Sequence, residues 1–147
     1  SSSSRGLGDV YKRQVFNVMV IELDKAVEYC RSRVGFPPLK LQNFWINING
    51  PGAYHTLHNH QDAMLSGVFY IDIPTENMGD LQFYRGDDAQ YYIPDNLSTY
   101  NTITSTMATY PPKPGMVVIF PSWVKHAVKQ NRSDAERIAI SFNYGAK

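Results

Sequence analysis

Apolar and polar residues alternate along most of the chain after the two prolines at 37–38. Short runs rich in β-branched and aromatic side chains are separated by Gly, Pro, Asn and Asp, the pattern of half-buried strands joined by turns. A Lys-Pro-Gly turn signal at 113–115, for example, precedes the apolar run 116–120. The pattern predicts a mostly β domain, a sandwich or barrel, with strands at 42–49, 54–60, 65–73, 80–85, 106–110, 116–120, 125–129 and 136–143.

The region before these strands has a helical period instead. Between residues 21 and 34 apolar side chains recur every three or four positions with charged residues between them, and Gly35 follows as a stop signal. We therefore expect one flanking amphipathic helix near the N-terminus, with an apolar face of Ile21, Ala26, Val27, Cys30 and Val34.

Length and composition point to one globular domain. A chain of 147 residues with 43% hydrophobic and 13% aromatic residues can bury a core without disulfides, and its single cysteine cannot form an internal one. A formal net charge of +1 without a Lys/Arg run disfavours nucleic acid as a partner. The apolar runs are too short to cross a bilayer, so no membrane partner is expected. Oligomeric state leaves no signature in the sequence.

The first fourteen residues differ in character from the rest. Residues 1–4 are a serine run, and residues 9–14 (Asp-Val-Tyr-Lys-Arg-Gln) resemble the translation of a transposon end used in sequencing libraries. We therefore expect residues 1–14 to be foreign, residues 15–147 to form a single domain, and the natural N-terminus to be missing.

The histidines supply the candidate chemistry. His60 and Asp62 share a face if the chain is extended there, and a neighbouring strand of a barrel can bring His126 opposite them. Two imidazoles and a carboxylate leave the remaining positions of a metal open, the arrangement typical of non-haem Fe(II) oxygenases. His60, Asp62 and His126 are thus the candidate metal ligands, whereas His55 is expected to be a surface or turn residue.

A basic residue on the last predicted strand adds to this picture. By alternation Arg137 and Ser141 share the face opposite Ile138 and Ile140. Burying an arginine is costly unless an anion meets it, and a guanidinium forms a planar fork for a carboxylate. Arg137, with help from Ser141, is therefore a candidate anchor for the far carboxylate of 2-oxoglutarate.

These residues belong to a wider set of motifs. Four segments carry these motifs: the stretch from Trp45 through His58-Asn59-His60, the run 65–70 (Leu-Ser-Gly-Val-Phe-Tyr), the run 120–123 (Phe-Pro-Ser-Trp) with His126, and the run 137–143 (Arg-Ile-Ala-Ile-Ser-Phe-Asn). Together they resemble a family of 2-oxoglutarate/Fe(II) oxygenases of bacteria and phages. The resemblance covers roughly residues 40–144.

The resemblance implies a cupin-like double-stranded β-helix, or jelly roll, with iron at its mouth. It implies that His126 is the distal ligand, that Arg137 anchors the cosubstrate, and that Tyr70 bonds the cosubstrate. It further implies a dioxygenase that uses Fe(II), 2-oxoglutarate and O2, hydroxylates its substrate, and releases succinate and CO2. The substrate, a small molecule or a protein side chain, is not indicated. The implied location is the cytoplasm of a bacterium or of a phage-infected cell.

The chain departs from the family where Gln61 and Asp62 follow the His-x-His pair, since relatives carry Pro and a small residue there. This leaves two ligand sets open: His60 and Asp62, which a carboxylate preference favours, or His58 and His60, with Asp62 orienting an imidazole. Asn47 and Asn143 are expected to line the substrate pocket.

Two other functions are compatible with a β domain of this kind. One is a cupin-like metalloenzyme that does not use 2-oxoglutarate, which leaves Arg137 without a distinctive role. The other is a non-catalytic jelly-roll binding module that displays tyrosines from the long polar segment 86–104, namely Tyr91, Tyr92 and Tyr100.

Overall fold

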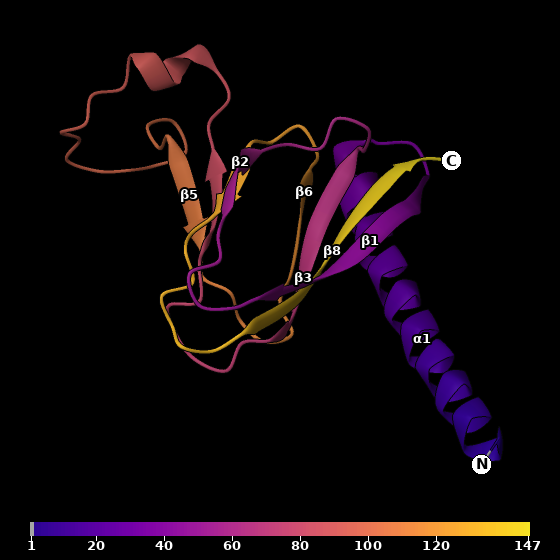
Figure 1. The fold of residues 1–147 in the computed structure, drawn as a ribbon. Coiled ribbons are helices and arrows are strands. Elements are labelled where there is room, and N and C mark those ends of the chain that lie inside the picture. Colours follow the sequence, from indigo (N-terminus) through magenta and orange to yellow (C-terminus); the bar gives the residue numbers. More distant parts are fainter. Residues whose placement is uncertain (1) are drawn as a thin grey trace.

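Two four-stranded sheets and one long helix make up the fold in a computed structural model that describes residues 2–147 (Figure 1). In chain order the elements are α1 (Ser2–Val34), β1 (Leu39–Asn49), β2 (His55–His58), β3 (Leu65–Asp72), β4 (Leu81–Tyr84), the 3₁₀ turn η1 (Asp88–Tyr91), β5 (Met107–Tyr110), β6 (Val117–Pro121), β7 (His126–Val128) and β8 (Arg137–Ala146).

The strands are arranged as a jelly roll. One sheet has the order β1-β8-β3-β6 and the other the order β2-β7-β4-β5, and every strand pair is antiparallel. Each of the eight strand ranges predicted from the alternation overlaps one observed strand, so the mostly β prediction is confirmed. Strands that are far apart in sequence thereby become neighbours, since β8 lies between β1 and β3.

The helix is longer than the pattern predicts, and it buries only the middle of the predicted apolar face. α1 begins at Ser2 rather than near Ile21, and Ile21 and Val34 are exposed. Val27 of the predicted face is buried, together with Leu23 one helical turn before it, in a core with Leu39, Leu65, Phe142 and Tyr144, and Cys30 packs against this core. The predicted apolar face was wrong at its two ends because only the sheet decides which side of a helix is covered.

A hydrogen bond ties the helix to the sheet. The Tyr144 hydroxyl donates to Asp24 Oδ1 at 2.7 Å. Burial of the phenol and, to a smaller extent, this contact with the carboxyl raise the pKa of Tyr144. The C-terminal half of α1 is therefore fixed on β8 by both apolar and polar contacts.

The N-terminal half of α1 projects away from the sheets (Figure 1). Residues 10–18 are exposed, and Phe16 contacts the sheet at Phe44, with a ring-centroid distance of 5.0 Å. The foreign origin of residues 1–14 stays a prediction. Among the described residues no helix is apolar enough over a sufficient length to cross a membrane.

Candidate functional site

A cavity of about 80 Å³ lies between the two sheets. Its walls come from both: β1, β3, β6 and β8 contribute one side, and β2, β4 and β7 the other. The lining residues are Trp45, Asn47, His55, His58, His60, Gly67, Val68, Tyr70, Leu81, Phe120, His126, Val128, Arg137, Ala139, Ser141 and Phe142. Imidazoles and one guanidinium are the basic groups in this otherwise largely apolar wall.

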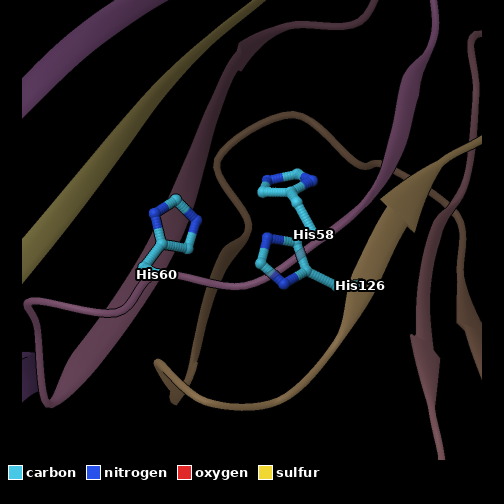
Figure 2. Close-up of side chains that lie close together, drawn as sticks. All are labelled: His58, His60 and His126. Atoms are coloured by element: carbon cyan, nitrogen blue, oxygen red, sulfur yellow. The ribbon is translucent and has the colours of Figure 1, made fainter.

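Three of the imidazoles gather at one place in the cavity wall. One ring nitrogen from each of His58, His60 and His126 lies within 4.8 Å of the others, and Figure 2 shows the three rings surrounding a shared space. His58 and His126 are directly opposite each other in the β2–β7 pair. An antiparallel register of this kind brings side chains on the same face together across the strands.

Hydrogen bonds orient two of these rings. His126 Nδ1 lies 2.9 Å from the carbonyl oxygen of Val124, and His58 Nδ1 lies 2.7 Å from that of Thr56. Because a carbonyl oxygen only accepts, both Nδ1 atoms carry the proton, and Nε2 keeps its lone pair for a metal. Each contact joins residues two apart, so the local backbone fixes the tautomer.

Burial favours the neutral form of the His60 and His126 rings. Desolvation, partly opposed by the contact with Val124 and reinforced by the neighbouring histidines, lowers the pKa of His126 to about 4. The phenyl ring of Phe120, 4.6 Å from the His126 ring between centroids, is part of the apolar wall that causes this. Burial also lowers the pKa of His60. Neutral imidazoles with free lone pairs are the form that binds a metal.

Asp62, the carboxylate first expected as a ligand, is not part of this group. β2 ends at His58, and residues 61–62 form an exposed turn. His58, the alternate ligand, lies beside His60 with 5.3 Å between the ring centroids, whereas Asp62 follows in the turn.

Arg137 lies in the wall formed by β8 and is buried, with 4% of its surface exposed. Nη1 donates to the carbonyl oxygen of Gly79 at 2.8 Å, and Nη2 donates to Asn49 Oδ1 at 3.1 Å. Nε has no partner, the one such buried side-chain atom among the described residues. A buried, incompletely paired guanidinium is costly, which makes an anionic ligand the natural partner for it.

The backbone at Gly79 makes one of these contacts possible. Gly79 has φ of +95°, and a Cβ there would overlap the carbonyl oxygen of Lys129. Only glycine fits this close approach in the left-handed region of φ without strain. The turn thereby directs a carbonyl oxygen at Arg137.

Tyr70, Ser141 and Asn47 lie in the same cavity wall. The Arg137 Cζ is 5.9 Å from the centroid of the Tyr70 ring, within range of a cation–π contact. Asn47 Nδ2 donates to Ser141 Oγ at 2.7 Å, which leaves the serine hydroxyl hydrogen free for a ligand.

Asn143, also expected in the pocket, does not line the cavity. Its Oδ1 accepts from Ser66 Oγ at 2.7 Å, and Ser66 Oγ lies 2.8 Å from Ser122 Oγ, so the three form a buried cluster. The backbone of Ser122 accepts from the His60 N–H at 2.9 Å. Asn143 is thus in the structure that supports a histidine rather than in the wall itself.

His55 was missed by the sequence analysis. It lies at the start of β2, lines the cavity and is half-buried, so the expectation of a surface or turn residue is wrong. Strict alternation would put His55 on the face opposite His58, and a register shift between the two residues in the β2–β7 pair, which no local pattern encodes, accompanies the presence of both in the cavity wall. It is not part of the three-histidine group.

The residues present fit a metal ion and a dicarboxylate. Nitrogen ligands about 2.1 Å from one ion would lie roughly 3 Å apart, and small side-chain rotations bring three atoms within 4.8 Å to that spacing. Arg137, whose Nε has no partner, lines the same cavity and offers the second site.

Comparison with known families gives one match. The sequence model of a family described as "Putative 2OG-Fe(II) oxygenase" matches residues 43–143, which is more than half of the chain. No protein with a curated description matches in sequence.

Solved structures share the fold at low sequence identity. HygX from Streptomyces hygroscopicus, solved with nickel and 2-oxoglutarate, has a TM-score of 0.63 at 13% identity, over 90% of this chain and 67% of its own. A prolyl-4-hydroxylase of Pseudomonas putida has a TM-score of 0.52 at 20% identity, over 73% and 54%. A 2OG-Fe(II) oxygenase family oxidoreductase from Burkholderia pseudomallei has a TM-score of 0.55 at 15% identity, over 73% and 45%. The chain thus spans about half the length of these last two proteins.

Proposed function

Because this chain belongs to the 2OG-Fe(II) oxygenase family, whose reaction uses Fe(II), 2-oxoglutarate and O2, we propose that it is a dioxygenase with a three-histidine iron site. His58, His60 and His126 hold the iron, and Arg137 binds the distal carboxylate of 2-oxoglutarate. This ligand set replaces the set with Asp62.

The remaining polar groups of the cavity complete the cosubstrate site. The Ser141 hydroxyl and the Tyr70 phenol lie in the wall that carries Arg137 and donate to the cosubstrate. The apolar side chains of Phe120 and Leu81 exclude water around the imidazoles. When bound, iron and cosubstrate supply the oxidation of a substrate by O2, with succinate and CO2 as co-products, while the protein positions the reactants.

One observation carries the proposal. A single cavity has three imidazole nitrogens within 4.8 Å of one another and also a buried arginine whose Nε has no partner. A metal ion and a carboxylate satisfy both features at once. A cupin-like enzyme without 2-oxoglutarate gives the arginine no ligand, and a metal-free binding module gives the histidines none.

The direct test is anaerobic titration of the protein with Fe(II) and then 2-oxoglutarate. Chelation of iron by the keto acid produces a weak visible charge-transfer band. We expect the band in the wild-type protein, and we expect Arg137→Ala to weaken 2-oxoglutarate binding by at least tenfold while it preserves Fe(II) binding.

Arg132→Ala is the matched control, because it removes an exposed arginine that does not line the cavity. Thermal unfolding of each variant establishes that it is folded. Iron binding without the band in folded wild-type protein would contradict the proposal and favour the cupin-like function. A band that Arg137→Ala leaves unchanged would contradict the role of Arg137.

A further inference from the structure

The hydrogen bonds around Arg137 continue to a histidine that has no part in the proposed iron site. Arg137 Nη2 donates to Asn49 Oδ1 at 3.1 Å, and Asn49 Nδ2 lies 3.2 Å from His55 Nε2. Asn49 and Arg137 are direct partners across the β1–β8 pair, and His55 lies in β2 of the other sheet. The chain of contacts therefore crosses from one sheet to the other beside the cavity.

The directions of these hydrogen bonds follow from the groups involved. A guanidinium only donates, so the Asn49 amide must turn its oxygen to Arg137 and its NH2 group to His55. His55 Nε2 must then accept, which requires a neutral imidazole with its proton on Nδ1. Rotating the Asn49 amide by half a turn would set its NH2 against that of Arg137, donor against donor.

The surroundings of His55 favour this state. Burial and the charge of Arg137 both lower the pKa of His55, so the ring is neutral near pH 7. The backbone of Asn49 is held as well, because its carbonyl oxygen accepts from Asn131 Nδ2 at 3.0 Å. What is left to hold at Asn49 is the side-chain amide, whose oxygen is required by Arg137 and whose NH2 group is held by the acceptor that His55 supplies.

We propose that His55 is a positioning residue for Arg137: by accepting from Asn49 it keeps the Asn49 oxygen on the guanidinium and so aims Arg137 at the cosubstrate carboxylate. The inference rests on the proposed function, and in it His55 acts on cosubstrate binding through Asn49 and Arg137. Gly79 and Asn49 together hold both Nη atoms, which restricts the guanidinium to one orientation and leaves Nε without a protein partner.

The first test reads the tautomer in the metal-free full chain by long-range ¹H–¹⁵N NMR of the histidine rings. At neutral pH we expect His55 to be protonated at Nδ1 and unprotonated at Nε2. Asn49→Asp replaces the NH2 donor by a second acceptor, so we expect it to move the His55 proton to Nε2. A proton on Nε2 in the wild-type protein, or no change in the variant, overturns the inference without reference to any cosubstrate.

The second test measures the dissociation constant of 2-oxoglutarate in the presence of Co(II), with metal affinity measured separately. His55→Leu removes the acceptor and should weaken 2-oxoglutarate binding at least tenfold. His55→Gln supplies a carbonyl oxygen that accepts from Asn49 and should stay within about threefold of the wild-type constant, since a neutral acceptor of similar reach restores the contact. Leu57→Ala, an exposed position on the same strand, is the control.

The outcomes separate the two claims. Wild-type protein that binds Co(II) but no 2-oxoglutarate overturns the proposed function and the inference with it. The inference alone is overturned if His55→Leu leaves the affinity for 2-oxoglutarate unchanged. It is also overturned if His55→Leu and His55→Gln weaken that affinity equally. The same holds if His55→Leu lowers Co(II) affinity as much as 2-oxoglutarate affinity, because His55 would then act on the metal site.

Discussion

The proposed iron ligands are three imidazoles, and backbone carbonyl groups orient two of them. His58 and His126 each donate Nδ1–H to a carbonyl oxygen two residues earlier in the chain, and burial lowers the pKa of His126 to about 4. A ligand prepared in this way loses little rotational freedom on binding, because its ring is already oriented. Single substitutions can therefore test whether His58 or Asp62 is the third ligand.

We predict that His58→Ala weakens Co(II) binding by more than about tenfold, whereas Asp62→Ala changes it by less than about threefold. His58 belongs to the three-histidine group, and Asp62 lies in an exposed turn outside it. Isothermal titration with Co(II) measures both variants. The opposite result, with Asp62→Ala the weaker binder, would restore the ligand set of His60, Asp62 and His126.

The metal-free protein should lose stability as the pH falls from about 6.5 toward 4. The folded-state pKa of His126 is lowered to about 4, below the value of 6.5 for an unperturbed histidine. Between these values the unfolded chain binds the proton and the folded chain does not, so the free energy of unfolding rises with pH across this window. At about 1.4 kcal/mol per pKa unit, His126 contributes at most roughly 3 kcal/mol.

Urea unfolding in the presence of a chelator, repeated at several pH values, measures this dependence. His126→Gln removes the titrating ring and should flatten the curve in the same window. A wild-type curve of constant stability from pH 7 to pH 4 would contradict the assignment of a buried neutral His126.

At the scale of the elements, α1 is held by the few side chains that reach the sheet. Leu23 and Val27 are 4% and 2% exposed, respectively, and pack with Leu39 and Tyr144, whereas Ile21 on the same helix is 52% exposed. Burial, rather than apolar character, therefore decides which of these residues stabilises the protein.

We predict that Leu23→Ala lowers the free energy of unfolding by about 3 kcal/mol, because it removes buried methyl groups and leaves a cavity under the sheet. Ile21→Ala, the matched control one half-turn away, should cost less than about 1 kcal/mol, since its side chain is already largely in water. Chemical denaturation of both variants gives the comparison. Equal losses would show that α1 buries another face.

At the scale of the whole molecule, the site exists because two sheets face each other. His58 and His126 come from one sheet, and Arg137 comes from the other, with the cavity between them. Residues 10–14 of α1 are exposed and do not line the cavity, and Phe16 beyond them contacts Phe44 of β1.

A chain that begins at residue 15 should therefore unfold with nearly the same free energy as the chain that begins at residue 1. We expect a difference of less than about 0.5 kcal/mol, the range of substitutions outside the core. Denaturation of both proteins, together with their Co(II) affinities, tests this. A loss of several kcal/mol on trimming would contradict the expectation that residues 1–14 are foreign to the domain.

The sequence by itself determined the strands and one wall of the site. Alternation with a period of two is a local property, so it placed eight strands and put Arg137 and Ser141 on the cavity face of β8 without knowledge of the neighbours. The family motifs could be recognised for a similar reason, because they are short runs of contiguous residues.

Tertiary structure decided which histidines meet. β2 ends at His58, and its register sets His58 opposite His126, which no local pattern encodes. Neighbouring elements likewise decide three other features. His55 lines the cavity through its place in β2, and Asn143 pairs with Ser66 rather than facing the cavity. α1 buries Leu23 rather than Ile21. A periodic pattern assigns side chains to a face, but strand ends, register and sheet packing determine what that face touches.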